Sequence, residues 1–169
     1  MRKFSLLFLG VLFSLLCEKR PTGEALEPFD GFTRTDPAGG YLSYDPSDWD
    51  YNRYLTVGYD TLGPGEIVPL ENVVLPPYPN PAYEGITFRL GIKETQYISM
   101  DFYSDKGMNL KFYEPKNALN PGIHELYLQL NDSRGEKFPE GLYRVIVTYY
   151  TDRDRIHPVY KTSGDIQVY

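Results

Sequence analysis

The chain has 169 residues and carries 23 Asp and Glu against 17 Lys and Arg, a formal net charge of −6. Proteins that bind nucleic acid need a basic surface for its phosphates, so this charge argues against a nucleic-acid partner. A single cysteine excludes an internal disulfide and a thiolate zinc site, and 15 Gly with 14 Pro indicate many turns and few long helices.

The N-terminus has the pattern of an export signal, and we expect residues 1–16 to be a signal peptide. Arg2 and Lys3 precede an apolar run, Phe4 to Leu16, that is too short for a comfortable transmembrane helix. The run ends on the only cysteine, Cys17. This arrangement resembles a bacterial lipoprotein signal, in which the cysteine is lipidated and becomes the mature N-terminus. The resemblance implies an exported protein held on a membrane of the bacterial envelope by acyl chains on Cys17. An ordinary signal peptide with a chance cysteine is the alternative.

Residues 17–77 are expected to form a tether and a loop-rich segment with one or two short edge strands. Turn residues cluster at 36–40 and 44–50, and short strand candidates run from Tyr54 to Tyr59 and from Glu66 to Leu70. The Asp residues of the second cluster suggest calcium ligands, but the cluster lacks the glycine and the distal glutamate of a calcium loop. We therefore predict no metal site and no cofactor.

Trp49 is the only tryptophan, and Tyr51 and Tyr54 follow it closely. Large aromatic side chains seldom remain in water without a reason, so docking of Trp49 on the rest of the protein is the favoured interpretation. The alternative is an exposed contact surface of Trp49, Tyr51 and Tyr54, which would suit a carbohydrate-binding module.

Residues 78–169 are predicted to form an Ig-like or fibronectin III-like antiparallel β-sandwich of about seven strands, which makes the protein all-β. Short runs with alternating apolar residues are separated by turn residues throughout this region. The run Leu142–Tyr149 is apolar on both faces, which indicates a central strand. For Met108–Tyr113 we expect Leu110 and Phe112 to point inward and Lys111 to face water. The residues predicted to share one core are Phe88, Met100, Phe102, Leu128, Tyr143, Val145 and Val147.

The C-terminal residues Asp165–Tyr169 are predicted to pair with the sheet as an edge strand. Ile166 and Val168 would form its apolar face, and the acidic Asp165 would protect the open edge from aggregation. Pro158 lacks an N–H, so the preceding stretch is expected at the rim of the sheet.

Several motifs of this region resemble two related bacterial modules. They are Tyr78-Pro79-Asn80-Pro81, Tyr103-Ser104-Asp105-Lys106-Gly107, Gly122-Ile123-His124, and Asp132-Ser133-Arg134-Gly135 followed by Pro139-Glu140-Gly141-Leu142-Tyr143. Together they are similar to the Ig-like domain of flagellar hook-capping proteins and to the C-terminal sorting domain of type IX secretion cargo. The resemblance implies a sandwich fold and, for the second family, an export address.

The sequence nominates no catalytic residue, and we predict that the protein is not an enzyme. His124 and His157 are the only histidines and have no partner at ligand spacing, and no nucleophile elbow, phosphate loop or dinucleotide fingerprint is present. The favoured function is a lipid-anchored protein of the bacterial envelope, on the periplasmic side or on the cell surface, whose sandwich serves structural assembly or protein–protein contact. The alternatives are a type IX secretion substrate with a sorting domain and a carbohydrate-binding module.

Overall fold

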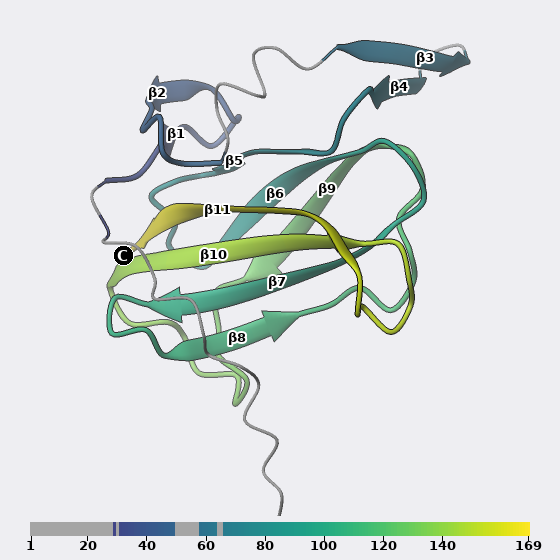
Figure 1. Ribbon diagram of the computed structural model, residues 1–169. Coiled ribbons are helices and arrows are strands. Elements are labelled where there is room, and N and C mark those ends of the chain that lie inside the picture. The colour runs from purple at the N-terminus through teal and green to yellow at the C-terminus, as the bar shows by residue number, and fades with distance from the viewer. Residues whose placement is uncertain (1–28, 30, 50–57, 64–65) are drawn as a thin grey trace, which may run out of the picture.

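The computed structural model describes residues 29, 31–49, 58–63 and 66–169 (Figure 1). Within these ranges every regular element is a β-strand, as the turn-rich sequence predicted. None of the described residues forms a helix that is long and apolar enough to cross a membrane. The predicted signal peptide, Cys17, Tyr51 and Tyr54 lie outside the described residues.

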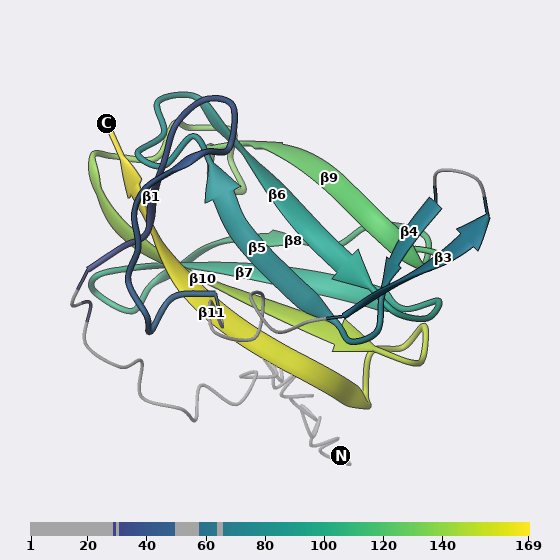
Figure 2. The same cartoon turned by 90° about the horizontal axis from the view of Figure 1, so that it is seen from above.

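Two antiparallel sheets face each other and form the predicted β-sandwich (Figures 1 and 2). One sheet has the strand order β5-β6-β9, with β5 at Val73–Tyr78, β6 at Gly85–Ile92 and β9 at Gly122–Gln129. The other has the order β11-β10-β7-β8, with β7 at Tyr97–Ser104, β8 at Asn109–Tyr113, β10 at Gly141–Tyr150 and β11 at Pro158–Val168. Since β10 lies between β11 and β7, its prediction as a central strand is confirmed.

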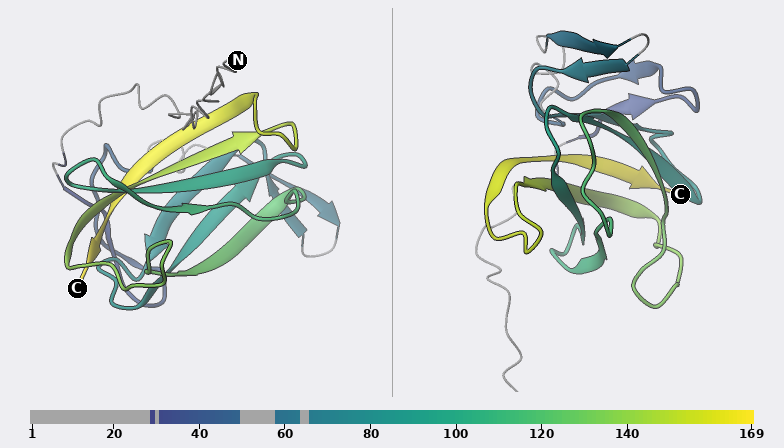
Figure 3. Two further views of the ribbon diagram at one scale, coloured as in Figure 1. Left: turned by 90° about the horizontal axis from the view of Figure 1, so that it is seen from below. Right: turned by 90° about the vertical axis from the view of Figure 1, so that its right-hand side faces the viewer.

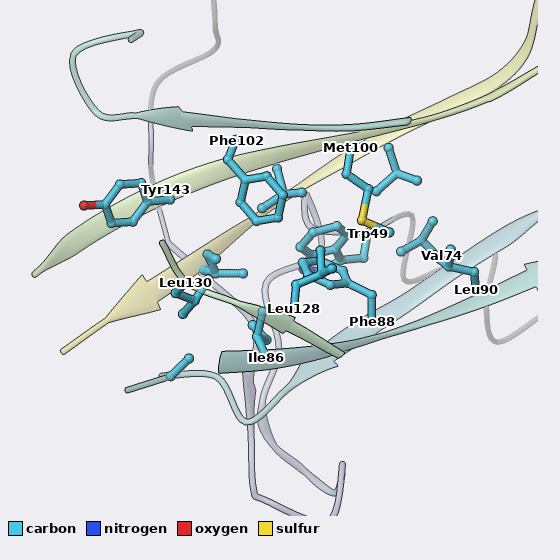
Figure 4. Close-up of a cluster of buried hydrophobic side chains, with 14 of the residues drawn as sticks. Trp49, Val74, Ile86, Phe88, Leu90, Met100, Phe102, Leu128, Leu130 and Tyr143 are labelled. Atoms are coloured by element: carbon cyan, nitrogen blue, oxygen red, sulfur yellow. The ribbon is translucent and has the colours of Figure 1, made fainter. Parts of the chain in front are cut away.

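The core fills the space between the two sheets (Figure 4). Alternate residues of each strand point inward because side chains on a strand change face at every residue. Phe88 and Phe102 meet edge to face across the interior at 6.0 Å between ring centroids, and Phe102 meets Phe138 in the same way. All seven residues predicted to share one core belong to this single buried cluster, so that prediction is confirmed.

The chain before Tyr78 contributes more strands than the one or two expected. Two small hairpins, β1 (Arg34–Thr35) with β2 (Tyr41–Ser43) and β3 (Tyr59–Gly63) with β4 (Glu66–Pro69), lie on the outer side of the three-stranded sheet (Figure 3, right). Strand β5 starts the sandwich at Val73, five residues before the expected boundary. The two prolines at its end conceal it in the sequence, and β5 tolerates them because it is an edge strand with a register shift between Leu75 and Tyr78.

The predicted faces of β8 are wrong in part. Lys111 pairs directly with the buried Phe102, so its side chain starts on the inner face, whereas Phe112 points outward and is 38% exposed. The cause is a register shift opposite Phe102 and Tyr103, because one extra residue in a strand exchanges its faces from that point on. Leu110, at the irregularity, still packs against the core as expected.

The tail forms a longer strand than predicted. β11 pairs with β10 from Pro158, opposite Tyr150, to Val168, opposite Gly141. Ile166 and Val168 are fully buried, which confirms their predicted apolar face. The expectation for Asp165 is wrong: it is 1% exposed and forms an ion pair with Arg144 instead of protecting an open edge in water.

Candidate functional site

The predicted contact surface does not form around Trp49. The indole is completely buried between the sheets (Figure 4), where it meets Phe88 edge to face at 5.9 Å between ring centroids. Gly164 makes this position possible, because a Cβ at that residue would overlap the indole ring. The favoured interpretation, that Trp49 docks on the rest of the protein, is therefore confirmed. The alternative, that Trp49 is an exposed contact residue, is wrong. A sugar-stacking surface needs an exposed ring, so Trp49 cannot supply one.

The outward edge of β11 is closed by two segments that lie far away in the sequence. The Trp49 N–H donates to the Ser163 carbonyl at 2.9 Å, and the Asp165 N–H donates to Oδ1 of Asp48 at 2.9 Å. Further along, Asn80 Nδ2 donates to the Asp165 carbonyl at 3.1 Å while its Oδ1 accepts the Gln167 N–H at 2.9 Å.

Ala82 completes this closure at the end of the strand. Its N–H donates to the Gln167 carbonyl at 2.8 Å, and its carbonyl accepts the Tyr169 N–H at 2.9 Å. We call Asp48, Trp49, Asn80 and Ala82 the edge cover. Together they bond the outward backbone groups of alternate residues from Ser163 to Tyr169, which are the groups that an unprotected edge strand would offer to another chain.

Asn80 connects the edge cover to the first hairpin. It is fully buried, its Nδ2 also donates to the Thr33 carbonyl at 2.7 Å, and its backbone pairs with Thr35. The hydroxyl of Thr35 donates to the Pro77 carbonyl at 2.7 Å. The Tyr-Pro-Asn-Pro motif therefore has a structural role that its resemblance did not predict: its asparagine joins β11 to residues 33–35.

A buried polar cluster lies at the centre of this junction. Oδ2 of Asp48 accepts the Thr33 N–H at 2.7 Å, so both of its carboxyl oxygens are bonded to backbone N–H groups. Beside it, Arg144 donates through Nε at 2.7 Å and through a terminal nitrogen at 2.8 Å to the two carboxylate oxygens of Asp165. The guanidinium also lies over the Phe29 ring, 4.8 Å from its centroid.

The electrostatics of this cluster are unusual for a surface loop. Burial raises the pKa of Asp48 to about 7, and the neighbouring Asp165 and Asp45 act in the same direction, against the two backbone hydrogen bonds. Sequence reasoning missed this residue because the Asp45–Asp50 run has the composition of an exposed turn. The one available signal was its position directly before the only tryptophan.

The opposite side of the sandwich ends in β8 and β9 and is built differently. Lys111 extends from β8 toward the other sheet, where its Nζ donates to the Gln129 carbonyl and to Oδ1 of Asn131. Burial lowers the pKa of this amine. An inward-pointing lysine on a short, irregular edge strand is a recognised protection against pairing with another chain.

The described residues hold no group of three or more His, Cys, Asp or Glu side chains that could bind a metal ion. The two histidines are separate: Nε2 of His124 lies 2.7 Å from the Asn120 carbonyl, and Nδ1 of His157 lies 3.1 Å from Oδ1 of Asp152. Neither side chain belongs to a triad-like arrangement with a nucleophile in the contacts of the described chain.

Comparison with known proteins finds no protein-family model and no curated protein that matches the chain. Four chains of solved structures match it. The crystal structure of dimeric latent PorU from Porphyromonas gingivalis resembles it with a TM-score of 0.45 and 17% sequence identity, over 58% of this chain and 9% of that chain. The chain therefore corresponds to a small part of the length of PorU.

Proposed function

We propose that this protein is a non-catalytic, lipid-anchored envelope protein whose β-sandwich serves protein–protein contact. The export and anchoring part is supported by the N-terminal sequence, in which a basic start and an apolar run end on Cys17. Residues 18–30 separate Cys17 from the first continuous described segment, and extended chain of that length spans at most roughly 45 Å. The sandwich would then remain close to the membrane that carries the lipid.

The contact part is carried by one observation, the exposed apolar side chains of the first hairpin. All three residues of β2 are exposed, Leu42 is 63% exposed, and the nearby Tyr44 is 57% exposed. The hairpin is nevertheless firmly supported, because Oδ1 of Asp36 accepts the N–H groups of Ala38 and Gly40 and because Thr35 bonds Asn80. Apolar side chains held in water on a fixed element are typical of contact surfaces.

The anchor is tested by mass spectrometry of the mature protein together with membrane fractionation. We expect a diacylated or triacylated N-terminus at Cys17, and we expect Cys17→Ser to release the protein from the membrane fraction. An unmodified Cys17, or membrane association that survives the substitution, would contradict the lipid anchor. The same spectra test the sorting-domain alternative, which predicts a mature protein that lacks residues 78–169.

The contact surface is tested by a photo-crosslinking amino acid placed at Leu42 in the native host. We expect a discrete crosslinked product from this position. The matched control is Ile156, which is 68% exposed in the turn between β10 and β11 and should give no such product. Equal products from both positions, or none from Leu42, would contradict the assignment of the first hairpin as the contact surface.

A further inference from the structure

The outward face of the four-stranded sheet is buried to an unusual degree. One face of an antiparallel sheet commonly meets water, and every second residue of a strand belongs to that face. Here the outward residues Ser99 and Thr148 are 2% and 7% exposed. On the same face, the ion-paired Arg144 and Asp165 are 9% and 1% exposed. Tyr150 covers part of it, because its hydroxyl oxygen lies 3.4 Å from Oγ of Ser99.

Phe29 adds cover from outside the sheet and marks the path of the chain. Its ring centroid lies 4.8 Å from Cζ of Arg144, over the outward face of β10. Four residues later, Thr33 lies beyond the edge of β11, where its N–H donates to Asp48 and its carbonyl accepts Asn80 Nδ2. Traced backward, the chain therefore passes from the edge of β11 onto this face. The segment that precedes Phe29 approaches the sandwich from the same side.

The face continues beyond Arg144 with apolar side chains in the direction of this path. Arg144 pairs across the sheet with Tyr103 of β7, and the next outward row joins Ile146 through Asp101 to Phe112 of β8. Tyr103 and Ile146 are half-buried, and Phe112 is the outward aromatic residue described above. We call Tyr103, Ile146 and Phe112 the outer strip. An apolar strip of this kind beside the entering chain is suited to an apolar side chain of that chain.

The sequence before Phe29 has such a side chain at a matching distance. Residues 24–28 are Glu-Ala-Leu-Glu-Pro, and they lie outside the described residues. Pro28 restricts the residue before it to extended conformations. Leu26 precedes Phe29 by three residues, which span about 10 Å of extended chain. Neighbouring strands are about 4.8 Å apart, so β8 lies roughly 10 Å from β10 and Leu26 can reach the outer strip.

We propose that Glu24–Pro28 docks across the outward face of the four-stranded sheet, with Leu26 packed on the outer strip. We call this segment the strap. The docking itself is independent of the lipid anchor, but one consequence rests on the proposed function. In the lipid-anchored protein only residues 18–23 remain as free spacer, roughly 20 Å when extended. The four-stranded sheet would then lie nearer the membrane than the first hairpin, which is on the outer side of the three-stranded sheet (Figure 3, right).

NMR of the unlipidated chain tests the strap without reference to the anchor. The protein is residues 17–169 with Cys17→Ser, so a failure of the lipid anchor does not affect the result. We expect nuclear Overhauser contacts between the Leu26 methyl groups and the ring protons of Tyr103 or Phe112. We also expect the Leu26 amide to show the slow relaxation behaviour of the strands. Absence of these contacts, with fast motion of the Leu26 amide, overturns the proposal.

Two neighbouring substitutions separate the strap from general effects on residues 24–28. Leu26→Ser should abolish the contacts with the outer strip and increase the fast motion of the adjacent amides. Ala25→Ser is the matched control, because successive side chains of an extended segment point to opposite sides, and it should keep the wild-type contacts and relaxation. Both variants should keep the wild-type far-UV circular dichroism. A Leu26→Ser chain that relaxes like the wild type overturns the proposal.

A mixed sample identifies which chain supplies the strap. Equal amounts of carbon-13-labelled and unlabelled protein are combined, and contacts between labelled and unlabelled copies are recorded selectively. We expect no contact of Leu26 with the outer strip in this experiment, because the strap and the strip belong to one chain. Contacts between copies would show that a second copy occupies the face, and they overturn docking within the chain.

Discussion

The two sides of the sandwich protect their edge strands in different ways. The β11 side is closed by the edge cover, which bonds the outward backbone groups from Ser163 to Tyr169 with residues more than 80 positions away. The β8 side has no covering segment in the described chain and depends instead on a short, irregular strand with an inward lysine. The edge cover of β11 makes the N-terminal hairpin part of the fold. The short, irregular β8 with its inward lysine is instead a poor partner for a strand of another chain.

The largest expected loss of stability comes from removing the indole of Trp49, which belongs to the edge cover. Trp49→Ala should lower the free energy of unfolding by about 3–5 kcal/mol, because it removes a fully buried aromatic side chain and leaves a cavity. Urea denaturation followed by far-UV circular dichroism measures this loss. Gly164→Ala should also destabilise, since its Cβ would occupy space of the indole. A loss below about 1 kcal/mol for Trp49→Ala would mean that the β11 side closes without its cover.

A smaller loss is expected at Asn80, which joins three segments through one amide. Asn80→Ala leaves two backbone carbonyls and the Gln167 N–H without their bonds, and it should reduce the free energy of unfolding by about 2–3 kcal/mol. The control is Asn109→Ala on β8, whose exposed amide donates to Asp101; its loss should change the free energy of unfolding by less than about 0.5 kcal/mol. If Asn80→Ala and Asn109→Ala lower the free energy of unfolding equally, the edge cover does not stabilise the β11 side more than the β8 side is stabilised.

A substitution on the β8 side should change the self-association of the protein rather than its stability. Lys111→Val removes the charge from the inner face of the edge strand, and we expect a higher apparent mass and more aggregation in light scattering, with a stability change within about 1 kcal/mol. Lys116→Val removes the same charge from an exposed loop position and serves as the control. If Lys111→Val scatters light like the wild type, the lysine does not protect this edge.

The smallest effect is predicted at Phe112, the aromatic residue that the structure turns outward. Phe112→Ser should change the free energy of unfolding by less than about 0.5 kcal/mol, in contrast to the several kcal/mol of a buried aromatic residue. Thermal denaturation is sufficient for the comparison. A loss above about 2 kcal/mol would restore the inward orientation that simple alternation predicts.

Local sequence determines some parts of this fold and leaves others to the pairing of distant strands. The alternation in β6, β7, β9 and β10 correctly predicted the core, because a period of two identifies a buried face without knowledge of the partner strand. It failed in β8, where the irregularity opposite Phe102 depends on pairing rather than on composition. The burial of Trp49 could be predicted from the size of its side chain alone. Its position over Gly164 could not be predicted, because the two residues are far apart in the sequence.

The edge cover was beyond sequence reasoning for the same reason. The bond between Asp48 and Asp165 joins residues 117 positions apart, and Asn80 reaches Asp165 across 85 positions. Nothing in a turn-rich run of aspartates indicates that one of them will be buried beside a second carboxylate. An asparagine between two prolines likewise has the local pattern of a linker until the strand that it bonds is in place.

The attachment of the first hairpin through Asn80 also fixes how the protein would bear mechanical force. For a molecule tethered at its N-terminus, tension enters the described chain near Gly31 and first meets the bonds of Thr33 to Asp48 and to Asn80. It then passes sideways into β11 and, through Asp165 and Arg144, to the central strand β10. Load that enters at the N-terminus therefore reaches the bonds of the first hairpin before it reaches the contacts between the two sheets.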